Sequence, residues 1–259
     1  MTVSAAAVLV SGIAAPAASA ADTVNYVALG DSYSSGTGAG DYLSGSGSCD
    51  RSADAYPEQW AAAHPSATFV SVACSSATTA SVVSSQLSML STKTTLVSIT
   101  IGGNDAGFSG VMETCVLSLT STCVKAVTTA ETFIAGQLPG RLDQTLRAIA
   151  TAAPNARVVV LGYPDLYDLS KSGSCLGLST SDRTALNQGA NDLDSALQTA
   201  AARFRSDVYA DVRGRFSGHE ICDSGSWLHS VDLLAISSSY HPTATGQELG
   251  YLPAFSADA

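Results

Sequence analysis

One hydroxyl near the start of the chain stands where a nucleophile could work. Residues 25–36, NYVALGDSYSSG, form an apolar run that ends at Leu29 and is followed by Gly30, an acid and Ser32. A serine hydroxyl is a weak nucleophile until a neighbouring base takes its proton. Ser32 is therefore a candidate nucleophile if a base from elsewhere in the chain reaches it, and otherwise part of a polar turn.

His241 is the best candidate for that base. It precedes Pro242 and the segment TATGQ, where we expect a helix to begin. A histidine held in a tight loop, with an ordinary pKa near neutrality, suits a general base. The alternative is a histidine that caps a helix or lies on the surface. The interpretation requires Ser32 and His241, near opposite ends of the chain, to meet within hydrogen-bonding reach. His64, His219 and His229 show no spacing typical of metal ligands, so we expect no metal.

Acyl transfer also needs N–H donors that stabilise the negative charge on the carbonyl oxygen. Gly103 and Asn104 directly follow an apolar run and offer a backbone bend and a side-chain amide. They could equally form an ordinary turn, because Gly and Asn are favoured in turns.

The elements that must position these residues follow from the hydrophobic pattern. Five apolar, β-branched runs predict strands, and helical patterns lie between them, which is typical of a parallel sheet with crossover helices. The predicted strands are 24–29, 67–72, 95–101, 157–161 and 207–212. The predicted helices are 56–63, 82–90, 131–150 with a break at Pro139–Gly140, and 183–204 capped by Ser179, Thr180 or Ser181. Because ligands bind beyond the carboxyl ends of parallel strands, Ser32, Ser76 and Asn104 should gather on one rim.

The composition indicates one large α/β domain outside the nucleic-acid-binding classes. The chain has 259 residues, of which 46% are hydrophobic, enough for one sizeable core. Asp and Glu number 22 against 12 Lys and Arg, a net charge of -10, with no basic run. Phosphate binding needs clustered cations, so we expect no nucleic-acid partner.

The first twenty residues predict export. Residues 3–20 are small and apolar and end in Ala-Ser-Ala, which is typical of a signal peptide and its cleavage site. We expect residues 1–20 to be this leader, a mature chain beginning near Ala21, and a secreted protein. No Lys or Arg precedes Arg51, so the basic front of such a leader is missing and the true start of the chain stays open. No later apolar run is long enough to cross a bilayer.

The cysteines are consistent with an oxidising compartment. The chain has six, Cys49, Cys74, Cys115, Cys123, Cys175 and Cys222, and none forms a C-x-x-C pair. An even number together with an export signal favours three disulfides over structural zinc. Spacing alone leaves the pairing open, and the simplest arrangement joins them sequentially.

Four blocks together resemble a known family. ALGDSYSSG at 28–36, VACSSATT at 72–79, ITIGGNDAGF at 99–108 and SYHPTATGQ at 239–247 resemble the SGNH-hydrolase superfamily, also called GDSL lipases and esterases. They are most similar to its secreted actinomycete branch of lipases, esterases and a phospholipase A1. The resemblance implies an α/β, flavodoxin-like three-layer fold with a parallel sheet of about five strands. It also implies Ser32 as nucleophile and His241 as base, with the Asn104 amide and the Ser32 and Ser76 N–H groups as oxyanion hole.

The sequence departs from the family pattern at two positions. Ser76 stands where the family has a glycine, which is acceptable if a non-glycine residue can adopt the backbone conformation. Ser238 stands where the usual aspartate precedes the histidine by three residues. Some members use a Ser–His dyad in which a main-chain carbonyl orients the imidazole. We therefore expect a carbonyl at Ser238 or Ser239 to do so, with Asp232 as the alternative.

Together these features predict a secreted serine ester hydrolase acting on lipid or fatty-acyl esters, without metal or cofactor and as a monomer, in one catalytic domain over 21–259. The alternatives are a phospholipase A1, a polysaccharide deacetylase and a non-catalytic extracellular binding module, for which the missing aspartate is the support. Tyr33, Phe108 and Tyr163 could shape an acyl pocket or simply belong to the core.

Overall fold

We analysed a computed structural model of the chain, which describes residues 1–3, 23–171, 175, 178–232 and 238–259. Of the leader expected over residues 1–20, only residues 1–3 are among them, and the rest lies outside the described residues. In the described part of the chain, no helix is both long and apolar enough to span a bilayer.

The core of the molecule is a parallel sheet of five strands in the order β2-β1-β3-β4-β5. This is the flavodoxin-like order, so the predicted fold class is confirmed. All five predicted strands are present, and the residues of β3 are buried throughout, as expected for strands covered on both faces. The strands are β1 (Asn25–Gly30), β2 (Thr68–Ser71), β3 (Leu96–Thr100), β4 (Arg157–Leu161) and β5 (Asp207–Ala210).

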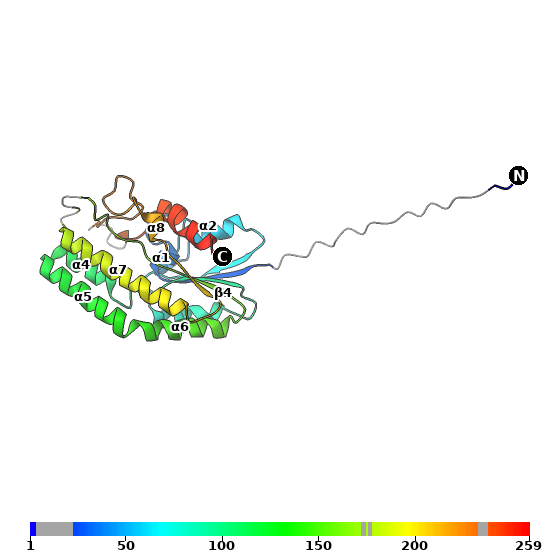
Figure 1. The fold of residues 1–259 in the computed structure, drawn as a ribbon, viewed down its shortest axis with the longest axis horizontal. Helices are drawn as coiled ribbons and strands as arrows, with labels where there is room; N and C mark the ends of the chain where they lie inside the picture. Colours follow the sequence, from blue (N-terminus) through cyan, green and yellow to red (C-terminus); the bar gives the residue numbers. More distant parts are fainter. Residues whose placement is uncertain (4–22, 172–174, 176–177, 233–237) are drawn as a thin grey trace.

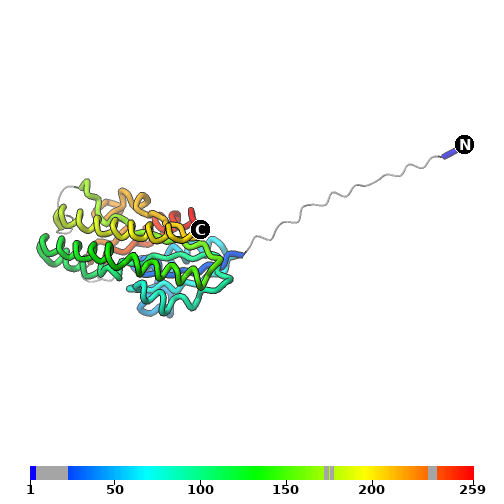
Figure 2. The backbone as a smooth tube through the Cα atoms, turned by 60° about the horizontal axis from the view of Figure 1, so that its bottom comes forward, coloured from blue at the N-terminus to red at the C-terminus, as the bar shows by residue number. Residues whose placement is uncertain are grey.

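Helices cover both faces of the sheet (Figure 1). One face carries α6 (Leu138–Ala152) and α7 (Thr180–Ala201), and Figure 2 shows α7 beside α5 (Thr120–Gly136). The other carries α2 (Tyr56–Ala63), α8 (Arg213–Phe216) and α9 (Leu252–Ser256). Alternate residues of each strand feed two hydrophobic clusters, so Val27 and Leu29 pack on the α6–α7 side, and Tyr26 and Ala28 on the α2–α9 side.

Three helical regions differ from the prediction. The break predicted in the helix over 131–150 is present, but it lies at Gln137, between α5 and α6, and Pro139 is in the first turn of α6, where its missing N–H costs no hydrogen bond. Helix α4 (Phe108–Leu117) was not predicted. The segment expected as one helix over 82–90 consists of a π-helical turn η2 (Val82–Gln86) and a 3₁₀ turn η3 (Leu87–Met89), and the short helix α3 (Thr79–Ser81) precedes it. Three short elements complete the fold: α1 (Ser32–Ser35), the 3₁₀ turn η1 (Gly47–Cys49) and the π-helical turn η5 (Gly246–Tyr251).

The cap of α7 and the disulfides agree with the sequence. Ser179 caps α7, with a reciprocal capping box to Asp182. The six cysteines form three disulfides in the sequential pairing, Cys49–Cys74, Cys115–Cys123 and Cys175–Cys222. Each bond therefore closes a local segment of chain.

Candidate active site

Ser32 is the first residue of a single helical turn that follows β1 directly. The Asp31 carboxylate caps this turn by accepting the Tyr33 N–H at 3.0 Å, and Gly36 ends it in the left-handed conformation at φ 84°. Gly30 makes the entry possible, because a Cβ there would lie 2.5 Å from the Thr100 carbonyl oxygen. Ser32 is consequently fixed at the carboxyl edge of the sheet and is only 7% exposed.

The Ser32 hydroxyl contacts the imidazole of His241. The Ser32 Oγ to His241 Nε2 distance is 2.7 Å, across 209 positions of the chain. The two groups that the sequence required to meet therefore lie within hydrogen-bonding reach. This is the geometry in which an imidazole can take the proton of a hydroxyl.

A short antiparallel pairing holds the backbone on either side of His241. The His229 N–H donates to the His241 carbonyl at 2.9 Å, and the Tyr240 N–H donates to the His229 carbonyl at 2.9 Å. His229 is itself anchored through Nε2, which lies 2.8 Å from the Gly38 carbonyl oxygen. His229 thus supports the loop of His241.

Ser238 and Ser239 lie within the same loop. The Ser238 carbonyl accepts the backbone N–H of His241 at 3.1 Å. The Ser239 hydroxyl accepts the backbone N–H of Asp232 at 2.9 Å, and Asp232 is an exposed residue. These bonds fix the backbone before His241, and the orientation of its imidazole by a carbonyl stays a prediction.

Tyr33, the neighbour of Ser32, is bonded to the loop of His241 and to the helical turn η5 that follows it. Its hydroxyl donates to the Tyr240 carbonyl at 2.6 Å, and its own carbonyl accepts a hydrogen bond from Gln247 Nε2 at 3.0 Å. Gln247 is fully buried, and its Oε1 accepts the Tyr56 N–H at 3.0 Å. Burial raises the pKa of the Tyr33 phenol, so this hydroxyl remains a donor. The sequence offered no sign of this connection, because the residues involved lie more than two hundred positions apart.

Asp31 supports the nucleophile turn. Its carboxylate accepts hydrogen bonds from the Tyr33 N–H, from the Thr100 hydroxyl at 2.7 Å and from the Tyr163 hydroxyl. Burial raises the pKa of Asp31 to about 6, although the hydrogen bonds from Thr100 and Tyr163 act in the opposite direction. Asp31 therefore holds the turn that carries Ser32.

The residues predicted for the oxyanion hole line the same pocket as Ser32 and His241. Ser76 has φ 65°, a left-handed conformation that favours glycine, so a serine here adopts a backbone conformation that is unusual for a residue with a side chain. Asn104 lies in the loop after β3 and donates through Nδ2 to the Ala77 carbonyl at 2.9 Å. This bond links the loops that carry Ser76 and Asn104.

Asp105 anchors those loops. Its carboxylate accepts the Thr79 N–H at 2.8 Å and the Thr79 hydroxyl at 2.6 Å, and it forms an ion pair with Arg141 at 3.3 Å. Asp105 thus joins the loop after β3 to α3 and α6.

The pocket beside Ser32 has a volume of about 580 Å³ and mostly apolar walls. The polar groups of the site lie at one end, and the remaining walls come from α4, α7 and the loop after β4. The apolar wall residues include Phe108, Met112, Val116, Leu166 and Leu193. Tyr33, Phe108 and Tyr163 all line it, so the aromatic residues considered from the sequence do face the pocket.

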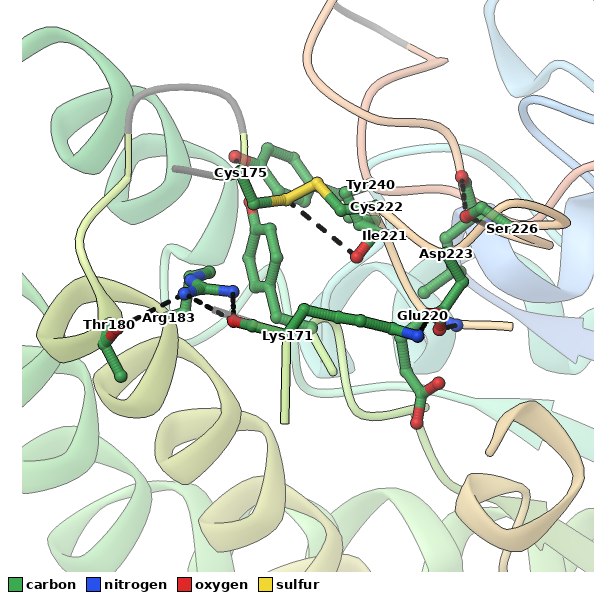
Figure 3. The surroundings of a disulfide bond; sticks show 12 residues. Lys171, Cys175, Thr180, Arg183, Glu220, Ile221, Cys222, Asp223, Ser226 and Tyr240 are labelled. Carbon is green, nitrogen blue, oxygen red and sulfur yellow. Dashed lines mark hydrogen bonds and ion pairs between the residues drawn. A yellow bond between two sulfur atoms is a disulfide. The ribbon is translucent and has the colours of Figure 1, made fainter. Parts of the chain in front are cut away.

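The loop after β4 is held in place by the Cys175–Cys222 disulfide (Figure 3). Beside this bond, Lys171 Nζ pairs with Asp223 at 3.1 Å, and the guanidinium of Arg183 donates to the Lys171 carbonyl at 3.3 Å. The adjoining residues Leu166 and Tyr167 pack here, and the Tyr167 hydroxyl donates to the Tyr240 hydroxyl at 3.1 Å. The disulfide therefore stabilises both a wall of the pocket and the neighbourhood of the histidine loop.

The two remaining histidines lie against tryptophans. His64 stacks on Trp60 at 3.9 Å between ring centroids, and His219 stacks on Trp227 at 3.8 Å. Within the ranges that the structure describes, no three His, Cys, Asp or Glu side chains are arranged to hold a metal ion.

A hydroxyl in contact with an imidazole, beside an apolar pocket at the carboxyl edge of a flavodoxin-like sheet, defines a serine ester hydrolase. The chain belongs to the GDSL-like Lipase/Acylhydrolase family, whose model matches residues 28–249.

Relatives and solved structures agree over nearly the whole chain. Lipase 1 of Streptomyces coelicolor is 51% identical over 253 residues, which cover 98% of this chain and 93% of that protein. The crystal structure of phospholipase A1 from Streptomyces albidoflavus NA297 is similar with a TM-score of 0.88 and 51% identity, covering 92% of this chain and 100% of that one. The crystal structure of an extracellular lipase from Streptomyces rimosus has a TM-score of 0.88 and 49% identity, with the same coverage.

Proposed function

We propose that the protein hydrolyses fatty-acyl esters through an acyl-enzyme on Ser32, with His241 as general base. The contact between Ser32 Oγ and His241 Nε2 at 2.7 Å is the observation that carries this proposal. Ser32 attacks the ester carbonyl carbon while its proton passes to His241. The imidazolium then gives this proton to the departing alcohol, and the acyl group stays on Ser32. Water attacks the acyl-enzyme with His241 again as base, which releases the acid and restores the serine.

The tetrahedral intermediate needs fixed donors. We assign them to the backbone N–H groups of Ser32 and Ser76 and to the Asn104 side-chain amide, which line one pocket. The Asn104 amide carries two N–H donors, and only one is needed for its bond to Ala77. Asn104→Ala should therefore lower kcat about 10²- to 10³-fold, the usual loss for one oxyanion donor.

The imidazole is oriented, in this proposal, by a main-chain carbonyl of Ser238 or Ser239, so that the site works as a dyad. The backbone of this loop is fixed by the bond between the Ser238 carbonyl and the His241 N–H. Asp232, the alternative carboxylate, is exposed. We expect Asp232→Asn to retain kcat within a few fold, whereas a loss approaching about 10⁴-fold would identify Asp232 as the third member of a triad.

The pocket favours a lipid acyl chain as the substrate group. Its walls of Phe108, Met112, Val116, Leu166 and Leu193 offer apolar surface that an alkyl chain can contact. Relatives at about half identity are named lipases, which supports the same class for this chain. Phospholipase A1 activity is the second candidate, because a solved structure with 51% identity bears that name.

We also propose that residues 21–259 form one secreted, monomeric catalytic domain and that residues 1–20 are its export leader. Three disulfides support an oxidising compartment. Mass spectrometry of the protein exported from a producing cell would locate the first residue, and a mature chain retaining residues 1–20 would contradict the assignment. Light scattering on the same material would test the monomer.

Fluorophosphonate labelling tests the mechanism. Wild-type protein should be captured at Ser32, and capture should disappear in Ser32→Ala and fall sharply in His241→Ala. Ser109→Ala is the matched control, because Ser109 lines the same pocket and should leave Ser32 labelled. Absence of capture under conditions that label a control serine esterase would favour the binding module.

Parallel assays then separate the substrate classes. One preparation of the protein should be assayed on four substrates: soluble nitrophenyl esters, triacylglycerol emulsions, phosphatidylcholine micelles and acetylated sugars. We expect turnover of long-chain acyl esters to exceed that of acetylated sugars, and the reverse order would favour the deacetylase.

A further inference from the structure

Exposed apolar side chains gather at the corner between α4 and α5. Leu117 is 64% exposed and Leu119 is 79% exposed, and Val124 in the first turns of α5 is 38% exposed. Single exposed leucines are ordinary, whereas a cluster beside a pocket indicates a binding surface. We call residues 117–124 the α4–α5 corner.

The corner is fixed so that its leucines stay in solvent. The Cys115–Cys123 disulfide closes it, and both cysteines are buried. The Leu119 carbonyl accepts the N–H groups of Thr122 at 2.8 Å and Cys123 at 3.1 Å, which fixes the start of α5. A flexible loop could fold its leucines back against the protein, but this corner is held by a covalent bond and by backbone hydrogen bonds.

The corner is continuous with the pocket. Leu117, at the end of α4, is one of the residues that line the pocket beside Ser32, and the preceding Val116 lines it too. Apolar surface thus extends from the pocket out to the exposed side of the corner. An alkyl chain leaving a lipid surface at the corner could enter the pocket without crossing open water.

The charge of the corner indicates which kind of lipid surface it can bind. Residues 114–124 contain no charged side chain, Glu113 and Lys125 flank them with one charge of each sign, and the whole chain has a net charge of -10. An anionic bilayer attracts basic segments, and the corner offers none. Apolar side chains surrounded by serine and threonine suit a neutral or zwitterionic surface instead.

The geometry points to the α4–α5 corner as the site where the enzyme docks on a zwitterionic lipid surface, with Leu119 and Val124 inserted and the pocket facing the lipid. This inference rests on the proposed function, because it names the surface from which that active site draws its substrate.

The test separates docking from catalysis. The probe is vesicles of ether-linked phosphatidylcholine, which contain no carboxylic ester and allow binding to be measured without turnover. The variant is Leu119→Ser/Val124→Ser, since neither residue lines the pocket. The matched control is Met89→Ser/Leu249→Ser, because both residues are 46% exposed and lie outside the corner and the pocket.

We expect wild type and control to bind the vesicles alike and the corner variant to bind at least about tenfold more weakly, a difference of about 1.4 kcal/mol. Hydrolysis of a soluble nitrophenyl ester should be the same in all three, which also shows that the variants fold. Three results would overturn docking at the corner: the corner variant binds vesicles as well as wild type, the control loses as much binding as the corner variant, or wild type binds only when the vesicles contain phosphatidylglycerol. Failure of wild type to hydrolyse the soluble ester would instead count against the proposed function.

Discussion

Tyr33→Phe removes one oxygen atom and should lower the rate of catalysis without changing the pocket. The Tyr33 hydroxyl donates to the Tyr240 carbonyl at 2.6 Å, next to His241, while Tyr33 itself adjoins Ser32. The phenylalanine ring would keep the contact with Tyr163, whose ring centroid lies 4.9 Å away. The substitution therefore cuts a direct bond between the two segments that carry the reacting groups.

The expected loss follows from the bond that is broken. Tyr240 is buried, so its carbonyl would lose a partner in a place with little access to water, at a cost of about 1–2 kcal/mol. If this free energy appears as a lower population of the Ser32–His241 contact, kcat falls about 5-fold for 1 kcal/mol and about 30-fold for 2 kcal/mol. KM should change by less than about twofold, because the ring of residue 33 still lines the pocket and the lost hydroxyl is bonded to the Tyr240 carbonyl.

The control is Tyr167→Phe. The Tyr167 hydroxyl bonds to the hydroxyl of Tyr240 and leaves the carbonyl alone, so kcat should stay near the wild-type value. Steady-state kinetics on a soluble nitrophenyl ester across pH, together with the rate of fluorophosphonate labelling, measure the effect. Tyr33→Phe should lower the plateau of the pH profile and the labelling rate in parallel, without moving the profile along the pH axis. A wild-type kcat in Tyr33→Phe, or an equal loss in Tyr167→Phe, would refute the reasoning.

Three further predictions concern the backbone, a buried carboxylate and a disulfide. Ser76→Gly should keep kcat within a few fold, because the proposed donor is the backbone N–H and φ 65° suits glycine; a loss above about 10²-fold would implicate the side chain. Burial raises the pKa of Asp207 from 3.8 to about 6. The protonated carboxyl of Asp207 therefore contributes fully to the free energy of unfolding below pH 3.8, and this contribution is lost as pH rises through 6. Relative to Asp207→Asn, wild type should therefore lose free energy of unfolding between pH 4 and pH 7 in urea titrations, and a constant difference would contradict this. Replacing Cys115 and Cys123 by serine should lower the free energy of unfolding by about 2–3 kcal/mol, the loop entropy of a disulfide that spans 8 positions, and an unchanged urea midpoint would exclude that value.

The strands were predictable because their pattern is unambiguous. Residues Val158–Val160 are apolar on both faces and are buried in the middle of the sheet, which is what a covered parallel strand requires. The order of the loops then placed Ser32, Ser76 and Asn104 on one edge without any knowledge of their contacts. Local composition, together with the rule that ligands bind beyond the carboxyl ends of parallel strands, was sufficient to predict which edge of the sheet carries the site.

Helix α4 and the start of α5 were not predictable from local pattern. Helix α4 begins after Gly107 in the left-handed conformation and contains Gly110, and α5 opens on a run rich in threonine, so intrinsic helix propensity is low in both. Packing of α5 against α7 and the Cys115–Cys123 bond stabilise what the local sequence does not favour.

The hydrogen bond from Tyr33 to the Tyr240 carbonyl could not be predicted from the sequence, for a different reason. It depends on a hydroxyl that reaches a backbone carbonyl 207 positions away and on the left-handed conformation of Tyr240, at φ 66°. A carbonyl has no residue-specific signature, so a bond of this kind leaves no motif in the sequence.

The distance along the chain between Ser32 and His241 has a consequence for when the enzyme becomes active. The serine belongs to the first strand-turn unit, whereas the histidine lies 209 positions later, just before the last helical segment. In the proposed mechanism, a polypeptide that emerges amino end first therefore exposes Ser32 long before its base, His241, has been made. Ester hydrolysis could then begin only after the last segment has docked, so an unfinished chain would leave the lipids of the producing cell intact.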